Sequence, residues 1–274
     1  MPPLDLADPL HASLLAFAAI VLGCWLVSVV TGNCSQTDRL WSVTPPVFVG
    51  IFAGYAGFGD ARLNLMFALT AAWGARLTFN FARKGGYTRG HEDYRWPILR
   101  EKLPGPVFQL FNIVFIAGYQ NVLLWLLALP AWRAWQARGS DLTWVDALAA
   151  GLFVLLLIGE SVADQQQWVF QTAKWARKNR GEAVEHEFLT TGLFRYSRHP
   201  NFFCEQALWW AFYGFAVAAT GQWLDVTIVG TVLLTLLFQG STPFTESITL
   251  KKYPEYAEYQ KTTSRLLPLP PRMP

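Results

Sequence analysis

Charged residues are scarce in this chain: Lys, Arg, Asp and Glu make up 15% of its 274 residues, whereas a soluble domain carries about 25%. Cysteine is scarcer still, since only Cys24, Cys34 and Cys204 occur, without a Cys-x-x-Cys pair. We therefore expect buried thiols, and neither an obligatory disulfide nor a metal site. The net charge of +3 gives no reason to expect nucleic acid as a partner.

Hydrophobic residues dominate instead, at 53% of the chain with 20 Phe and 13 Trp. They gather in apolar runs, several of which approach the roughly 20 residues that a helix needs to cross a bilayer. The first run lacks a basic leader and a cleavage motif, so we interpret it as a retained span rather than a signal peptide. The expected spans are Ser13–Val30, Thr44–Gly59, Leu63–Phe81, Val107–Pro130, Trp144–Ala163, Phe202–Thr220 and Asp225–Gly240.

Lys and Arg are distributed unevenly between the two sets of connections. Eighteen of the 22 follow the first, third, fifth or seventh span, and only Arg62, Arg133 and Arg138 lie in the connections on the opposite side. Cytoplasmic connections are enriched in these residues, which predicts a cytoplasmic C-terminus. With no internal repeat and no soluble second domain, we expect an all-α integral membrane bundle of about seven transmembrane helices, formed by residues 1–274 as a single domain.

A basic segment precedes the sixth expected span. Arg195, Arg198 and His199 come directly before Pro200, which is suited to the first turn of a helix. A helix start flanked by such residues is typical of an anion site, because its N–H groups and the cationic side chains attract the same charge. Positive-inside anchoring at an ordinary helix start is the alternative.

Polar pairs on helical spacing mark two of the expected spans. Asn201 and Glu205 lie one turn apart and run into an apolar sequence, where an unpartnered carboxylate is costly. Anchoring alone does not account for that pair. Glu160 and Asp164 have the same spacing near the end of the fifth span. They are either acceptors for a ligand or the polar exit of a helix from the bilayer.

Glu246 follows the seventh span, and Tyr253, Tyr256 and Tyr259 come after it at three-residue intervals. Tyr suits an interface where one end of the side chain is wet. This segment therefore indicates either an amphipathic surface helix or a set of ligand contacts.

The amino-terminal half carries further candidates. Arg76 lies in the middle of the third span, where it needs a partner or a polar cavity. The loop that contains Tyr94 has charges of both signs and either covers a cofactor or is solvated. Gln36 and Asp38, after the first span, either face a substrate or belong to a polar connector.

Together these motifs resemble the steroid 5-alpha-reductase family, in its branch of seven-helix members. The resemblance is strongest over residues 152–268, which would form the cofactor-binding part of the domain. The residues that carry it are Gly159–Gln165, Gly192–Glu205, and Glu246 with Tyr253–Tyr259, and more weakly Asp38–Trp41, Trp73–Leu77 and Glu92–Trp96.

The resemblance implies a membrane reductase that uses NADPH to reduce an enone or a related double bond, with Asp164, Asn201 and Glu205 at the nicotinamide. Trp73 stands where the steroid reductases place a tyrosine, and it has no phenolic proton. The catalytic group at the substrate carbonyl would then be Gln36, Asp38 or Tyr94. The phosphates would lie near Arg76, Arg195, Arg198 and His199. The full set expected to bind the cofactor is Arg76, Glu160, Asp164, Arg195, Arg198, His199, Asn201, Glu205, Glu246 and Tyr256.

Two alternatives stay open. Arg198–His199–Pro200 also resembles the isoprenylcysteine and phospholipid methyltransferases, which bind S-adenosylmethionine, and a lipid-binding membrane protein without chemistry is the third interpretation. In the reductase interpretation, a hydrophobic substrate enters from the membrane lipid and no obligatory protein partner is evident. The protein would lie in the endoplasmic reticulum membrane of a eukaryote or the inner membrane of a bacterium.

Overall fold

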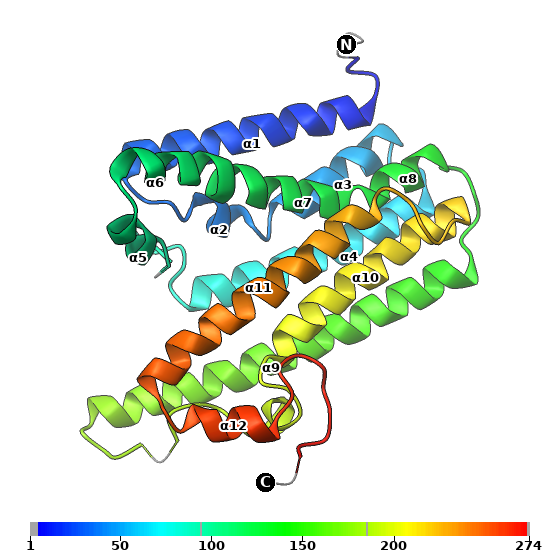
Figure 1. Ribbon diagram of the computed structural model, residues 1–274. Helices are drawn as coiled ribbons and strands as arrows, with labels where there is room; N and C mark the ends of the chain where they lie inside the picture. The colour runs from blue at the N-terminus through cyan, green and yellow to red at the C-terminus, as the bar shows by residue number, and fades with distance from the viewer. Residues whose placement is uncertain (1–4, 94, 185, 273–274) are drawn as a thin grey trace. The chain divides into compact units, whose positions relative to one another are not determined.

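The computed structural model describes residues 5–93, 95–184 and 186–272, and within these ranges it contains helices but no strand (Figure 1). The expected all-α fold class is confirmed. The helices are α1 (Pro9–Thr31), α2 (Gln36–Leu40), α3 (Thr44–Tyr55), α4 (Ala61–Arg83), α5 (Arg95–Lys102), α6 (Gly105–Phe111), the π-helix η1 (Asn112–Tyr119), α7 (Gln120–Ala128), α8 (Pro130–Gln136), α9 (Trp144–Asn179), the 3-10 helix η2 (Gly192–Arg195), α10 (Pro200–Thr220), α11 (Ile228–Lys252) and α12 (Tyr256–Thr262).

Each of the seven expected spans coincides with a helix or with the continuous segment α6–η1–α7. In the described part of the chain, four segments are long and apolar enough to cross a membrane: Pro9–Thr31, Gly105–Gln136, Trp144–Asn179 and Ile228–Lys252. The chain is therefore an all-α membrane protein, while the count of seven crossings and the cytoplasmic C-terminus stay predictions.

Two helices extend well beyond the expected spans. Helix α9 continues past Ala163 to Asn179, and α11 continues past Gly240 to Lys252 with Pro243 inside it. Hydropathy locates the apolar stretch but not the helix end, because charged residues such as Glu and Lys are good helix formers outside the bilayer. Glu160 and Asp164 consequently lie in the middle of a helix, and Glu246 lies within α11 rather than after it.

The chain divides into two compact units. Unit 1 comprises residues 1–150 and 212–232, and unit 2 comprises residues 151–211 and 233–274. In unit 1, α3 packs against α1, α4, α7 and α8, and its Phe48, Val49, Phe52 and Ala53 are fully buried. All the boundaries between the units fall inside α9, α10 and α11.

Local chemistry sets the ends of the helices in unit 1. The Asp8 side chain accepts a hydrogen bond from the Leu10 N–H at 2.9 Å, Pro9 begins α1, and Gly32 ends it with φ of 68°. Asp60 caps α4 in the same way through the Leu63 N–H at 2.9 Å. The helices therefore begin and end where the sequence supplies capping residues.

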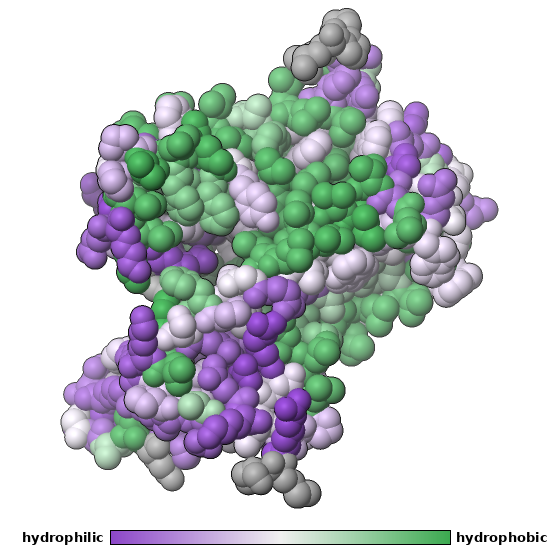
Figure 2. Space-filling view, viewed as in Figure 1, coloured by the Kyte–Doolittle hydropathy of each residue, from purple (hydrophilic) through white to green (hydrophobic). Residues whose placement is uncertain are grey.

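The surface of unit 1 carries the hydropathy pattern of a membrane protein. In Figure 2 the hydrophobic colour covers α1 and the segment α6–η1–α7, and hydrophilic residues gather over α5 at one end of this apolar face. A soluble protein rarely exposes so continuous an apolar surface, which agrees with the long apolar helices.

Candidate functional site

The segment before α10 is held against the carboxy-terminal tail by backbone hydrogen bonds in unit 2. The N–H of Arg198 donates to the Ser264 carbonyl at 2.8 Å, and the N–H of His199 donates to the Arg265 carbonyl at 3.2 Å. The Ser197 hydroxyl donates to the Leu266 carbonyl at 2.7 Å. This tail is not helical, and α10 begins at Pro200, which the sequence placed in a first helical turn.

Glu246 of α11 is the centre of a buried polar cluster and is only 5% exposed. Its two carboxylate oxygens accept hydrogen bonds from Arg198 Nε at 2.7 Å and Arg198 Nη2 at 3.0 Å. His199 Nε2 lies 2.9 Å from Oε1, and Gln260 Nε2 donates to Oε2 at 3.0 Å. These paired, charge-assisted hydrogen bonds fix the side chains of Arg198 and Glu246, and the guanidinium neutralises the carboxylate.

Aromatic side chains of α12 close this cluster. Tyr256 donates to Glu246 Oε1 at 3.3 Å, and Tyr259 donates to the Phe194 carbonyl. Phe188 packs edge-on against Tyr256, with ring centroids 5.0 Å apart, and stacks on Tyr259. Burial raises the pKa of both tyrosines well above the usual range, so both phenols stay protonated hydrogen-bond donors.

The basic residues of the expected anion site take different positions. Arg198 donates to Glu246 and also to the Gln260 carbonyl at 3.1 Å, so its donors are already used within the protein. Arg195 is exposed and, among the described residues, has no hydrogen-bond or ion-pair partner. It lines an open cleft of about 640 Å³ together with Glu255 and Glu258. Arg195 thus differs from Arg198 in having no partner within the described part of the chain.

Of the two expected pairs of polar residues on α9 and α10, Asp164 is buried and Asn201 is half-buried. Asn201 Nδ2 donates to Asp164 Oδ1 at 3.3 Å, so one member of each pair meets the other. Glu160 and Glu205 are likewise buried, and Glu205 Oε1 accepts from the indole N–H of Trp209 at 3.0 Å. The side chains described here include no group of His, Cys, Asp or Glu able to hold a metal ion.

Close approach of α9 and α10 supports this pairing. A Cβ at Gly159 would lie 3.1 Å from the Cys204 sulfur. Glycine at this position lets the two helices come close enough for the Asn201–Asp164 hydrogen bond.

Gln36, Asp38 and Arg76 belong to unit 1. Gln36 lies in α2, where its amide donates to the Asn33 carbonyl at 3.2 Å and accepts from Arg39 at 3.3 Å. Arg76 is half-buried in α4. Tyr94 lies outside the described residues.

Asp38 lies in α2 with a defined set of partners. Its Oδ2 accepts from the indole N–H of Trp96 at 2.9 Å, and its Oδ1 lies 3.9 Å from Arg95. Burial raises the pKa of Asp38 above its ordinary value, while the Trp96 hydrogen bond and the Arg95 charge act in the opposite direction. A carboxyl with a raised pKa can hold a proton closer to neutral pH.

Two residues of unit 2 were not among the expected site residues. Gln260 completes the Glu246 cluster, and its position four residues after Tyr256 on one helix face was the available signal. Lys174 is buried, 3.0 Å from Glu187 Oε2, and donates to the Tyr253 hydroxyl at 3.2 Å. No local spacing predicts that contact, because Lys174 and Tyr253 are 79 residues apart.

Comparison with known proteins identifies relatives over most of the chain. A family model described as "Protein of unknown function (DUF1295)" matches residues 24–263. The uncharacterized protein C594.04c of Schizosaccharomyces pombe is 41% identical over 260 residues, which cover 89% of this chain and 75% of that protein. No solved structure matches.

Proposed function

The chain belongs to the DUF1295 family, and from that premise we propose that it is a membrane reductase that transfers hydride from NADPH to the double bond of a hydrophobic enone. The observation that carries the proposal is the hydrogen bond of 3.3 Å between Asn201 and Asp164. It joins the two helices on which the reductase-like motifs lie. Buried ionisable residues in apolar helices mark functional sites.

The side chains of Asp164, Asn201 and Glu205 suit the nicotinamide end of the cofactor. A carboxamide offers two N–H donors and one acceptor oxygen. Carboxylates of Asp164 and Glu205 accept such donors, and the Asn201 amide can do either. For the phosphates, Arg195 faces an open cleft without a partner of its own in the described chain.

When bound, NADPH would supply the hydride to the β-carbon of the enone, and the protein would orient the reactants and manage charge and protons. An enolate oxygen that gains charge needs a hydrogen-bond or proton donor. Asp38, whose pKa is raised by burial, would hold that proton, and Gln36 is the neighbouring amide donor.

The apolar helices imply how such a substrate arrives. A hydrophobic enone partitions into the bilayer and would enter from the lipid, whereas NADPH would come from the cytoplasm. The host membrane would be the endoplasmic reticulum in a eukaryote or the inner membrane in a bacterium. Seven crossings would put the basic connections and the C-terminus on the cytoplasmic side.

Calorimetric titration of the detergent-purified chain tests the proposal. We expect micromolar binding of NADPH that weakens with salt, and no measurable binding of S-adenosylmethionine. Asn201→Ala should abolish NADPH binding, whereas Asp141→Asn, at an exposed carboxylate outside the cleft that Arg195 lines, should leave it unchanged. If Asn201→Ala bound NADPH with wild-type affinity, the cofactor site would not lie at α9 and α10.

One observation favours a methyltransferase as the second candidate. Three buried carboxylates, Glu160, Asp164 and Glu205, lie on α9 and α10, and Arg198 is neutralised by Glu246. A group of acidic side chains suits the sulfonium cation of S-adenosylmethionine better than it suits a polyanion. The same titration distinguishes the two proposals. Preferential binding of S-adenosylmethionine would favour the methyltransferase over the reductase.

A further inference from the structure

A second polar cavity lies in unit 1 at the carboxyl end of α1. Its volume is about 480 Å³. It is formed where the connection from α1 to α2 meets the turn after α4. Its lining includes Val27, Thr31, Gln36, Arg39, Tyr87 and Arg89.

The cavity is cationic. None of the described residues that line it is acidic, and two arginines are among them. Arg39 donates to the Gln36 side chain at 3.3 Å and to the His91 carbonyl at 3.0 Å, while its buried Nε has no partner. Arg89 is exposed, and within the described chain its side chain makes no hydrogen bond or ion pair. Two guanidinium groups therefore face this space without a carboxylate.

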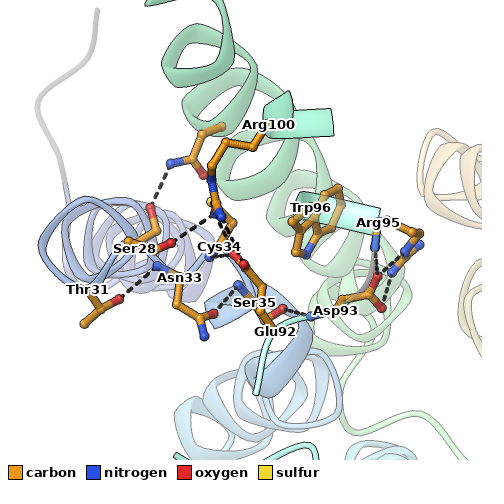
Figure 3. Close-up of polar contacts among 12 residues, drawn as sticks. Ser28, Thr31, Asn33, Cys34, Ser35, Glu92, Asp93, Arg95, Trp96 and Arg100 are labelled. Atoms are coloured by element: carbon orange, nitrogen blue, oxygen red, sulfur yellow. Dashed lines mark hydrogen bonds and ion pairs between the residues drawn. The ribbon is translucent and has the colours of Figure 1, made fainter. Parts of the chain in front are cut away.

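The neighbouring carboxylates are paired with other side chains (Figure 3). Glu92 accepts from Arg100 at 2.7 Å and from the Cys34 N–H at 2.8 Å. Asp93 accepts from Arg95 Nε at 2.7 Å. These bonds use the nearby acidic groups, and neither Arg39 nor Arg89 forms an ion pair with a carboxylate of the described residues.

The turn that carries Arg89 contains two glycines in the left-handed conformation and is hydrogen-bonded to α2. Gly85 and Gly90 both adopt φ of 82°, a backbone conformation that favours glycine. The Tyr87 hydroxyl donates to the Arg39 carbonyl at 3.0 Å, which fixes the turn against α2. This hydrogen bond brings the turn that carries Arg89 next to Arg39.

The place of the cavity in the fold indicates which anion it suits. Val27, which is 44% exposed, and Thr31 form the last turns of α1, whose apolar length is sufficient to cross a membrane. The end of such a helix lies at the level of lipid headgroups. Arginine binds phosphate through paired N–H groups, and anionic lipids concentrate at cytoplasmic surfaces.

We propose that this cavity binds the phosphate group of an anionic phospholipid, with an acyl chain lying along α1 beside Val27. The proposed lipid site depends on neither the residues assigned to NADPH nor the proposed reductase activity, although Gln36, a donor proposed for that reaction, also lines the cavity. Arg39 and Arg89 donate to the phosphate oxygens. The lipid thereby anchors the connection between α1 and α2 at the membrane surface.

Native mass spectrometry of the full chain in mild detergent tests the site. The probes are phosphatidylglycerol and phosphatidylcholine, with inorganic phosphate and NADPH as competitors. We expect one phosphatidylglycerol to bind in preference to phosphatidylcholine, and Arg39→Gln and Arg89→Gln each to weaken it about tenfold through loss of charge-assisted hydrogen bonds. Arg180→Gln removes the same charge at an exposed arginine paired with Glu182 and should leave binding unchanged.

Each other result overturns the proposal. Equal binding of both lipids, or unchanged affinity in Arg89→Gln, would show that the cavity does not select an anionic headgroup. Displacement of the lipid by inorganic phosphate would show a free-phosphate site, and displacement by NADPH would show a nucleotide site. Arg89 makes no bond within the described chain, so Arg89→Gln should fold normally.

Discussion

Arg198 and Glu246 form a bidentate ion pair, with Nε–Oε1 at 2.7 Å and Nη2–Oε2 at 3.0 Å. Both side chains are largely buried, and the pair connects the residues before α10 with α11. Removing one partner of a buried pair leaves the other charge uncompensated, which costs more free energy than the intact pair supplies. Substitution of either Arg198 or Glu246 alone should therefore destabilise unit 2 strongly.

We expect Glu246→Gln to lower the free energy of unfolding by about 3 kcal/mol, because Arg198 would keep its charge without a carboxylate. Thermal unfolding in detergent, followed by circular dichroism, measures the change. Glu258→Gln removes a carboxylate that is paired only at the surface with Lys261, and it should cost less than about 0.5 kcal/mol. Equal stability of the two variants would contradict the structural role of the pair.

In unit 1, Asp146→Asn should lower the free energy of unfolding by about 3 kcal/mol through the same effect. Asp146 pairs with Arg62 at 2.7 Å, and each side chain is only 1% exposed. The matched control is Asp141→Asn, at an exposed carboxylate nearby. The unfolding midpoint of that control should equal that of the wild type.

Substitution by Ala should lower the free energy of unfolding by different amounts at two glycines that have a left-handed backbone conformation. Gly192 has φ of 63°, and a Cβ there would lie 2.5 Å from the Gln166 side chain, whereas Gly181 has φ of 72° with nothing within 4 Å. Gly181→Ala should cost about 1 kcal/mol for the backbone alone. Gly192→Ala should cost more and should displace Gln166, which accepts from the Leu193 N–H at 2.9 Å.

Thermal unfolding of both glycine variants gives the difference. If Gly192→Ala lowered the free energy of unfolding no more than Gly181→Ala does, the Gln166 side chain would move away from the new Cβ without strain.

The raised pKa of Asp38 predicts that the free energy of unfolding depends on pH. Its pKa is raised from 3.8 by burial, so the folded protein binds this proton more tightly than the unfolded chain does. Its contribution to the free energy of unfolding is fully present below its unfolded pKa and is lost as pH rises through the folded pKa. Asp38→Asn should remove this loss, and unfolding midpoints measured across that pH range for both proteins provide the test.

The same carboxyl predicts an effect on catalysis. If Asp38 is the proton donor of the proposed reductase, Asp38→Asn should reduce turnover by about 10²-fold or more and leave NADPH affinity unchanged. Turnover of the wild type should fall as pH rises through the pKa of Asp38. Equal loss of turnover and affinity would instead assign Asp38 to the cofactor site.

Hydropathy located the helices correctly but placed several of their ends too early. The run that ends at Ala163 belongs to a helix that continues to Asn179. The apolar sequence reports where lipid would contact the chain, whereas the helix continues wherever its hydrogen bonds are satisfied. For the same reason Glu246 was expected after its helix and lies within it.

Local spacing also found parts of the candidate site. Asn201 and Glu205, like Glu160 and Asp164, were grouped from their helical spacing and their apolar surroundings, and all four lie on α9 or α10. Spacing carried no information on partners across the fold. The hydrogen bond from Asn201 to Asp164 spans 37 residues of sequence.

The sequence by itself determined the all-α membrane class, the approximate helices and the residues rich in polar chemistry, because apolar length and helical period are local properties. Only the tertiary structure decided how the charges are used. It pairs Arg198 with Glu246, 48 residues away, and leaves Arg39, Arg89 and Arg195 without carboxylate partners in the described chain. Long-range packing sets these partners, since a charge is neutralised by the groups that lie beside it in space and not by its neighbours along the chain.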